Sequence, residues 1–347
     1  MMVASRRHVV IIKPCCLGDL ILVTALLSDI KRHWSQAEIT VITSAWSSQA
    51  VTPHPAVTRV VNSGHIGLRR HPPIDDLVRL TMTLRSLKAS VVLVPDRSPV
   101  LSILTRLSGI PVRAGLDSGG RGRWYTTRVP PLPHAHELEQ GRSLLRVLGI
   151  PTGALPSFQP GPEAHEAAND ILAHLLPRPK FVILAPGGGT NPGTVMTSKR
   201  WSAEGFAAVA HHLAAQGYVP VLVGSESDRT AAAQVQALVP QARNWTGLTP
   251  LGVLGALATR ASAFVGNDSG VSHLAAATGC PTVAVFGPTA AELYAPVGKA
   301  VATVEPPRAA AYAGEGTVRL PFQFTEPWQE LVTPAAVIEA LRRLLTP

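Results

Sequence analysis

Cysteine is scarce in this sequence, and its scarcity limits the cross-links available. Three cysteines among 347 residues leave one without a partner, and two of them, Cys15 and Cys16, are adjacent. A disulfide between neighbouring residues is strained and rare, so we expect free thiols and a reducing compartment. The sequence also has no Cys-x-x-Cys pair and no His-x-x-x-His pair, so it gives no sign of a zinc or other metal site.

Long apolar runs are missing as well. Polar or helix-breaking residues interrupt every apolar stretch before the roughly 18 to 20 residues that a membrane-spanning helix needs. Arg6 and Arg7 precede an apolar run, as in a signal peptide, but Lys13, Pro14 and Asp19 interrupt that run. We therefore expect a strand, a turn and a helix there, and no transmembrane segment. The length and the 46% hydrophobic content favour two domains, each with its own core.

Aromatic residues make up only 5% of the chain, and no basic helix interleaves them with arginine. Nucleic acid is therefore not an expected partner. Charge is uneven, because residues 1–150 carry 19 Lys and Arg against 9 Asp and Glu, whereas residues 151–347 carry 12 against 13. The basic half favours an anionic partner, although its arginines could instead serve solubility alone. The candidates for binding such a partner are Arg69, Arg70, Arg97 and Arg121.

Strand-like and helix-like segments alternate along the chain, which is typical of an α/β fold with parallel sheets. In the first half the pattern predicts strands at 9–12, 39–42, 57–61 and 91–94, and helices at 19–34 and 75–87. A segment rich in proline and glycine, 150–162, reads as a linker. Beyond it we expect strands at 181–184, 219–223 and 282–286 and one ending at Gly266, with helices at 202–216, 228–238, from Pro250 with Thr249 as N-cap, and from Ser269.

This organisation predicts two Rossmann-like lobes with a cleft between them. The first lobe covers residues 1–155 and the second covers residues 156–330. Residues 331–347 form a C-terminal helix that could pack back on the first lobe.

The segment from Gly266 to Leu274 is the most informative one. A buried strand ends in a short polar turn, and a helix then opens at Ser269 and Gly270. Helix N-termini offer unpaired N–H groups and a positive dipole end, which suit a diphosphate. Asp268 would repel an anion, unless it shapes the turn or contacts a ligand hydroxyl. The alternative is a plain strand-to-helix connection with Asp268 or Ser269 as N-cap and His273 as an ordinary helix histidine.

Two further segments place polar residues directly after strands. Asp19 follows the first strand, where it is either a helix N-cap or a general base that takes a proton from a hydroxyl. Gly188 and Gly189 follow the strand at 181–184 and allow a ligand to approach the backbone, and Thr190 and Lys199 could then bind phosphate. Lys199 could equally be a surface lysine, and the loop 190–198 could be a lid or mobile decoration.

Glu226 and Asp228 follow the strand at 219–223. An acid at such a strand end accepts hydrogen bonds from ribose hydroxyls in dinucleotide-binding folds, which makes Glu226 a candidate for the nucleoside. Asp228 is a rival candidate, although it suits the N-cap of the next helix better.

Taken together, Leu17-Gly18-Asp19, Pro186 to Gly189 with Lys199-Arg200-Trp201, and Asn267 to Gly270 with His273 resemble glycosyltransferase family nine, the family of ADP-heptose:lipopolysaccharide heptosyltransferases. The resemblance implies a GT-B fold with the donor nucleotide on the C-terminal lobe and the acceptor on the N-terminal lobe. It also implies a catalytic role for Asp19 and a place near the base for Leu248. Cys15 and Cys16 and the long loop 190–198 depart from the family pattern.

These features lead us to expect an inverting, metal-independent glycosyltransferase with no cofactor. The expected donor is a nucleotide diphosphate sugar such as ADP-heptose, and the expected acceptor is an acidic glycan or glycolipid such as the lipopolysaccharide core. The expected location is the cytoplasm, with peripheral contact at the inner membrane surface. The alternatives are a different sugar nucleotide with another glycan or a small metabolite as acceptor, and a GT-B epimerase, hydrolase or nucleotide-binding protein without transfer.

Overall fold

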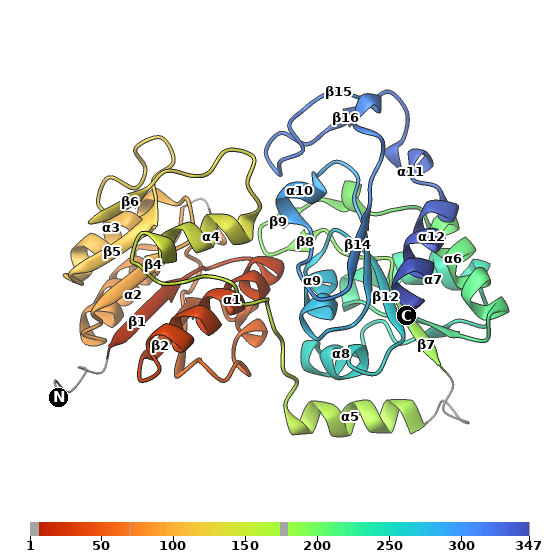
Figure 1. Cartoon of the computed structure of the whole chain (residues 1–347), viewed down its shortest axis with the longest axis horizontal. Helices are drawn as coiled ribbons and strands as arrows, with labels where there is room; N and C mark the ends of the chain where they lie inside the picture. The colour runs from red at the N-terminus through yellow and green to blue at the C-terminus, as the bar shows by residue number, and fades with distance from the viewer. Residues whose placement is uncertain (1–6, 70, 174–179, 347) are drawn as a thin grey trace. The chain divides into compact units, whose positions relative to one another are not determined.

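The chain folds into two compact units, Met1–Pro156 and Ser157–Pro347. The computed structural model describes residues 7–69, 71–173 and 180–346. Each unit has its own sheet flanked by helices, so the predicted α/β class with two Rossmann-like lobes is confirmed (Figure 1). The boundary between the units lies one residue after the predicted position.

Six parallel strands form the sheet of the first unit, because short runs rich in valine and isoleucine can be buried on both faces. Val9 in the central strand pairs with Ile39 on one side and Val91 on the other. The order across the sheet is β3 (Arg59–Asn62), β2 (Glu38–Thr43), β1 (His8–Ile12), β4 (Val91–Val94), β5 (Val112–Leu116) and β6 (Thr127–Val129).

Helices cover both faces of this sheet (Figure 1). Helix α1 (Leu17–His33) packs beside α4 (Glu137–Arg146) on one face, and α2 (Ile74–Ser86) packs beside α3 (Pro99–Ser108) on the other. Helix α1 starts at Leu17 with Cys16 as N-cap, two residues earlier than predicted. The interpretation of Asp19 as an N-cap is therefore wrong, since its carboxylate lies inside the first turn. A short 3-10 turn, η1 (Ser48–Ala50), follows β2.

The second unit repeats the plan with six parallel strands. Their order is β11 (Arg243–Asn244), β10 (Val219–Leu222), β7 (Phe181–Ala185), β12 (Ala263–Asn267), β13 (Thr282–Val285) and β14 (Val301–Val304). One face carries α6 (Ala203–Ala215), α7 (Arg229–Leu238) and α12 (Pro334–Leu345). The other carries α8 (Leu251–Ala258) and α9 (Gly270–Ala277), with α5 (Pro162–Ala173) against α8 (Figure 1).

Shorter elements join these layers. The loop predicted at 190–198 is a small antiparallel hairpin followed by a 3-10 turn. Helix α8 has Pro250 and not Thr249 as its N-cap, because Leu251 is the first residue in helical geometry. The short elements are β8 (Thr190–Asn191), β9 (Thr194–Val195), η2 (Thr197–Lys199), η3 (Glu226–Asp228), α10 (Ala291–Tyr294), η4 (Arg308–Ala310), β15 (Ala311–Ala313), β16 (Gln323–Phe324) and α11 (Trp328–Leu331).

The C-terminal helix α12 belongs to the second unit. Its apolar residues Val337 and Leu341 are buried in the core that covers β13 and β14. The sequence analysis allowed this helix to pack back on the first lobe, and the structure corrects that expectation. The reason is an apolar stripe on α12 that matches the exposed side of its own sheet and of α6.

Both sheets have the same strand order, in which the first strand of the unit lies beside its fourth. The chain adds its first three strands toward one edge of the sheet and the next three toward the other edge. The switch point between the two halves lies between β1 and β4 in the first unit and between β7 and β12 in the second. In open parallel sheets, ligands bind outside the carboxyl ends of the strands at this switch point. Among the described residues, no helix has the length and apolar character to cross a membrane.

Candidate functional site

A buried lysine lies at the switch point of the first unit. Lys13 directly follows β1, and Asp96 comes two residues after the neighbouring strand β4. The Lys13 ammonium nitrogen is 2.9 Å from a carboxylate oxygen of Asp19 and 3.6 Å from one of Asp96. The fold thus brings one cation and two acids to the edge where a substrate would bind.

Acidic neighbours stabilise the protonated, positively charged form of Lys13. Burial by itself would lower the pKa of this ammonium group. The carboxylates of Asp19, Asp96 and Glu137 outweigh that effect and raise the pKa above its usual value. Lys13 is therefore positively charged at any pH near neutrality, and it links the three acids electrostatically.

The Asp19 carboxylate is accessible from solvent, as the sequence-based prediction of a general base requires. The Asp19 side chain is 36% exposed, whereas that of Lys13 is only 10% exposed. The buried ammonium group fixes one carboxylate oxygen and leaves the carboxylate accessible from solvent. Sequence reasoning selected Asp19 and missed Lys13 and Asp96. The signal for those two was their position after strands that become neighbours in the sheet.

Cys15 and Cys16 lie between Lys13 and helix α1. Their sulfur atoms form a disulfide, and the peptide bond between them is cis. The expectation of two free thiols is therefore wrong. The two residues lie in the turn between β1 and α1, and the Cys16 carbonyl oxygen accepts the first hydrogen bond of the helix, from the Leu20 N–H at 2.9 Å. The argument for a reducing compartment loses its support, because only Cys280 is a free cysteine among the described residues.

At the switch point of the second unit, the side chain of Asn267 joins three segments. Its amide nitrogen donates to the carbonyl oxygens of Pro186 and Gly187, both at 2.9 Å. Its amide oxygen accepts from the backbone N–H of Trp201, also at 2.9 Å. The buried end of β12 therefore positions the glycine loop after β7 and the residues that follow Lys199.

Asp228 holds the other side of the glycine loop. Its carboxylate accepts from the backbone N–H of Gly188 at 2.9 Å and from Ser225 N–H at 2.9 Å, and it lies 3.1 Å from the Arg200 guanidinium. Asp228 occupies the N-cap position of α7, but its side chain makes no cap hydrogen bond there. Because Gly188 N–H is engaged by Asp228, any role of Gly188 toward a ligand comes from its lack of a side chain.

The glycine loop lies close to the start of α9. A Cβ at Gly188 would come within 2.7 Å of the Ser269 side chain, and Gly188 has a positive φ of 101°. Ser269 is the N-cap of α9 and makes no side-chain cap hydrogen bond. Gly270 is the first helical residue, and His273 is buried in the first turn. Only glycine fits at position 188, so the backbone of the loop can approach the positive end of the helix.

Lys199 and Asp268 form the charged centre of this site. The Lys199 ammonium nitrogen donates to an Asp268 carboxylate oxygen at 2.6 Å, and the Thr289 hydroxyl donates to the same oxygen at 2.5 Å. Asp268 is buried and Lys199 is largely so. Asp268 thus positions the lysine beside the helix start. Thr190, in contrast, lies exposed in β8 of the adjacent hairpin.

The residues predicted to bind the nucleoside lie together. Glu226 is exposed and pairs with Arg229. A Cβ at Gly247 would come within 2.7 Å of a Glu226 carboxylate oxygen, which places the exposed Leu248 next to this acid. An exposed acidic group and an exposed apolar side chain are therefore adjacent.

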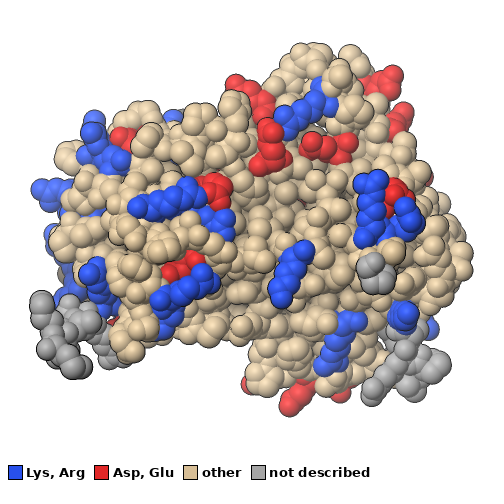
Figure 2. Space-filling view, in the orientation of Figure 1, with Lys and Arg blue, Asp and Glu red and all other residues tan. Residues whose placement is uncertain are grey.

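The predicted acceptor residues are placed separately. Arg97 pairs with Glu137 at 2.9 Å and so joins the cluster around Lys13. Arg69 is exposed in a segment that packs on Pro14 through Gly67. Arg121 is exposed in the turn after β5, and Arg70 lies outside the described residues. Figure 2 shows basic side chains spread over the face of the first unit that carries α1 and α4.

Within the described ranges, no group of three or more His, Cys, Asp or Glu side chains could hold a metal ion. At the switch point of the second unit, Lys199, Arg200 and the N-terminus of α9 are sources of positive charge.

Comparison with known proteins gives a consistent result. Residues 77–313 match the family model described as glycosyltransferase family 9 (heptosyltransferase). The chain is 25% identical to lipopolysaccharide heptosyltransferase 3 of Escherichia coli over 281 residues, which cover 78% of this chain and 81% of that protein. It is 26% identical to lipopolysaccharide heptosyltransferase 2 of Salmonella typhimurium, with 83% and 85% covered.

Solved structures agree on the fold. The structure of Escherichia coli ADP-heptose lipopolysaccharide heptosyltransferase II matches with a TM-score of 0.76 and 23% identity, covering 97% of this chain and 98% of that one. A glycosyl transferase family 9 protein of Veillonella parvula matches with a TM-score of 0.79 and 22% identity, covering 98% and 97%. These likenesses confirm the predicted GT-B fold.

Proposed function

The chain belongs to glycosyltransferase family 9, and from that premise we propose that it transfers a heptose from ADP-heptose to a hydroxyl group of a lipopolysaccharide core. The observation that carries the proposal is the pair of charged clusters at the two switch points. One cluster contains an accessible carboxylate, Asp19, and the other contains a lysine, Lys199, beside a helix N-terminus. The names of the relatives support the choice of donor sugar and acceptor.

In this proposal the second unit binds the donor. The diphosphate lies at the N-terminus of α9, near the glycine loop, and accepts hydrogen bonds from backbone N–H groups of the helix start. The Lys199 ammonium, which Asp268 positions, adds a charge-assisted hydrogen bond. Glu226 accepts hydrogen bonds from the ribose hydroxyls, and Leu248 contacts the base.

Transfer then proceeds as a single displacement. The Asp19 carboxylate takes the proton of the acceptor hydroxyl as its oxygen forms a bond to the anomeric carbon. The bond from that carbon to the phosphate oxygen breaks at the same time, and ADP leaves with its electron pair. Attack from the face opposite the leaving group inverts the anomeric configuration. Lys199 and the α9 N-terminus stabilise the negative charge that develops on the leaving phosphate.

The proposal includes metal independence, because these groups of the chain supply the positive charge that the leaving group needs. It also places the enzyme in the cytoplasm, in peripheral contact with the inner membrane surface. The acceptor in this proposal is a glycolipid, and the first 150 residues carry a strong positive charge.

Donor and product measurements test the proposal. We expect ADP-heptose to raise the melting temperature more than GDP-, UDP- or ADP-hexoses do, because a bound ligand stabilises the folded state in proportion to its affinity. With a heptose-deficient core acceptor, NMR of the product should show inverted anomeric configuration, and EDTA should leave the rate unchanged.

Three outcomes would contradict parts of the proposal. A preference for another sugar nucleotide would show that the donor is not ADP-heptose, while the assignment as a glycosyltransferase would stand. Epimerisation or hydrolysis of the donor without any acceptor would favour the alternative of a GT-B enzyme that does not transfer. If EDTA abolished the transfer activity and a divalent metal restored it, the enzyme would be metal-dependent.

A further inference from the structure

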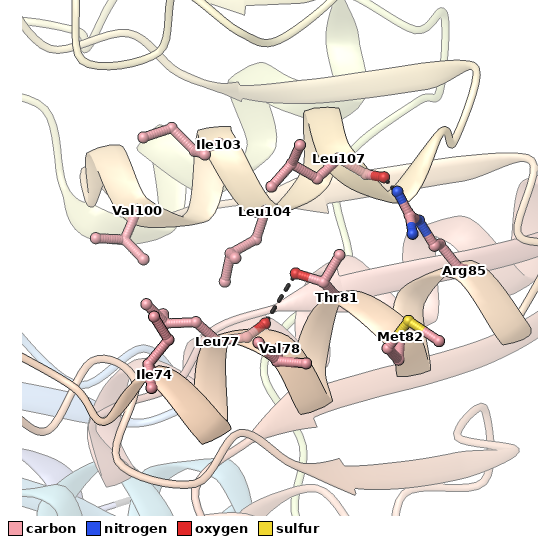
Figure 3. Close-up of a pocket in the computed structure, with 10 residues that line it drawn as sticks. All are labelled: Ile74, Leu77, Val78, Thr81, Met82, Arg85, Val100, Ile103, Leu104 and Leu107. Atoms are coloured by element: carbon pink, nitrogen blue, oxygen red, sulfur yellow. Dashed lines mark hydrogen bonds between the residues drawn. The ribbon is translucent and has the colours of Figure 1, made fainter.

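An apolar groove runs between α2 and α3 on the surface of the first unit. Its volume is about 480 Å³, and it is lined almost entirely by aliphatic side chains. Figure 3 shows that Ile74, Val78 and Met82 come from α2, whereas Ile103 and Leu107 come from α3. These five side chains are all exposed, with 74% of Ile74 and 57% of Met82 accessible to solvent.

Helix α2 is apolar on two sides, which is unusual for a surface helix. Leu80 and Leu84 are buried against the sheet. Ile74, Val78 and Met82 follow each other at intervals of four residues and form a second stripe that faces solvent. Helix α3 repeats this pattern, because Leu101 and Leu104 are buried while Ile103 and Leu107 are exposed. Packing within the unit therefore does not account for the outer stripe.

The surroundings of the groove are basic. Between Leu77 and Leu116 the sequence contains six Lys and Arg and a single acid, Asp96. That acid is engaged by Lys13 at 3.6 Å. At the C-terminal ends of α2 and α3, the Arg85 guanidinium donates to the Leu107 carbonyl oxygen at 3.0 Å. Arg106 and Lys88 are exposed at the same ends of the two helices.

The other end of the groove carries two acids, one of them paired with an arginine. Asp75 and Asp76 lie in the first turn of α2, and Asp76 is paired with Arg79 and accepts a hydrogen bond from His65 at 2.9 Å. This end lies at the carboxyl edge of the sheet, since α3 begins at Pro99, three residues after Asp96. The groove therefore has a basic end and an end that lies at the carboxyl edge of the sheet.

We propose that the α2–α3 groove docks on an anionic phospholipid bilayer, with its exposed aliphatic side chains inserted among the lipids and its basic end on the lipid phosphates. The combination of aliphatic stripe and arginine or lysine rim is what an interfacial membrane contact requires. A second copy of this chain is the other candidate occupant, and the oligomeric state in solution distinguishes the two. This inference deepens the peripheral contact in the proposed function by naming its surface, and it rests on that function only for the reason to approach a membrane.

Vesicle binding by the full chain tests this surface. Parent protein should float with vesicles of phosphatidylcholine containing about one-third phosphatidylglycerol, and much less with phosphatidylcholine alone. Val78→Glu and Met82→Glu should each lower vesicle affinity at least about tenfold, because a carboxylate at the lipid boundary is costly and meets anionic headgroups. Both positions are exposed, so neither change disturbs the core. Val147→Glu, at an exposed valine after α4, is the matched control and should bind as the parent does.

The contribution of charge has its own pair of variants. Arg106→Ser should weaken binding to the anionic vesicles several-fold, because one cation near an anionic surface contributes on the order of 1 kcal/mol. Arg59→Ser removes the same charge from an exposed position in the edge strand β3, outside α2 and α3, and should have little effect.

The readout separates this inference from the proposed function. Val78→Glu should keep the parent's donor affinity and its rate with a lipid-free acceptor. If the parent protein had no transfer activity at all, the proposed function would fail, but the vesicle-binding result would still test the groove. The inference is overturned if the parent does not bind anionic vesicles, or if Val78→Glu and Met82→Glu bind as well as Val147→Glu. It is also overturned if light scattering shows a dimeric parent that Met82→Glu converts to a monomer, because the occupant is then a second copy.

Discussion

The Lys199 ammonium lies 2.6 Å from the carboxylate of Asp268, so the lysine that we assign to phosphate binding is already held by an acid. The Asp268 carboxylate also accepts a hydrogen bond from the Thr289 hydroxyl, and the residue lies directly after β12, at the switch point of its sheet. A long lysine side chain loses much of its rotational freedom in this arrangement before any ligand arrives. The carboxylate that seemed out of place beside an anion therefore has a positioning role.

Lys199→Ala should weaken binding of a nucleoside diphosphate by about 1.5 to 3 kcal/mol, the contribution of a charge-assisted hydrogen bond. Affinity for the free nucleoside should change little, because a nucleoside has no phosphate for the Lys199 ammonium to bind. Calorimetry with both ligands checks the difference. Lys299→Ala, at an exposed lysine of the second unit, is the control. Equal loss for both ligands would place Lys199 away from the phosphates.

Asp19→Asn should reduce turnover by about 100-fold or more while donor affinity stays near the parent value, because an amide cannot accept the proton of the acceptor hydroxyl. Single-turnover rates and donor calorimetry separate the two effects. Asp75→Asn makes the same change in the first turn of α2 and should keep the parent rate. A rate for Asp19→Asn within a few-fold of the parent would exclude the base role.

Salt should weaken binding of an acidic acceptor while nucleoside binding hardly changes, because exposed charges are screened over about 10 Å at 0.1 M salt. Arg69→Ala should raise the KM for the acceptor and leave donor affinity unchanged. Arg243→Ala, at an exposed arginine of the second unit, is the matched control. If neither salt nor Arg69→Ala alters the KM, the excess of positive charge in the first 150 residues serves solubility only.

Alkylation of cysteines should follow the pairing in the structure. Native protein should resist alkylation near neutral pH, because burial raises the pKa of the Cys280 thiol to about 12 and the other two sulfurs are joined. Unfolding without reductant should expose one thiol, and unfolding with reductant should expose three. Mass spectrometry counts the labels. Three labels without reductant would show that Cys15 and Cys16 are reduced in the isolated protein.

The sequence predicts best where a short segment contains its own explanation. The strand, turn and helix around Gly266 to Ala277 and the first strand with α1 are found within two residues of the predicted bounds. Their apolar periodicity and helix-start residues are local signals. The same signals led to Asp19, Lys199 and Asp268, although their roles remain predictions.

The partners of these residues depend on contacts distant in sequence, and a local pattern does not show them. Lys13 meets Asp96 only because β1 and β4 are neighbours, and Asp228 reaches the N–H of Gly188, 40 residues away. The direction in which a C-terminal helix packs is equally hidden, because an apolar stripe shows that α12 is covered but not by what. Strand order, once known, would have predicted the Lys13 cluster.

The last prediction concerns His54, a buried histidine of the first unit. Burial lowers the pKa of its ring to about 4. Its Nδ1 atom accepts a hydrogen bond from Ala56 N–H at 3.2 Å, and its Nε2 atom lies 3.3 Å from the Ser28 hydroxyl oxygen. Protonation of Nδ1 would replace that acceptor with a donor facing another N–H group. The folded state therefore prefers the neutral ring.

Because the unfolded chain titrates near the ordinary value of about 6.5, it binds more protons than the folded chain between that pH and about pH 4. The stabilisation is fully present above about pH 6.5, and the unfolding free energy should fall by about 3 kcal/mol as the pH drops to 4. His54→Asn keeps an acceptor for the Ala56 N–H but does not titrate. Urea unfolding of this variant should therefore show no such fall in the unfolding free energy between about pH 6.5 and pH 4. His71→Asn, at an exposed histidine, should keep the parent's pH dependence. An unchanged slope in His54→Asn would show that His54 does not cause the acid sensitivity.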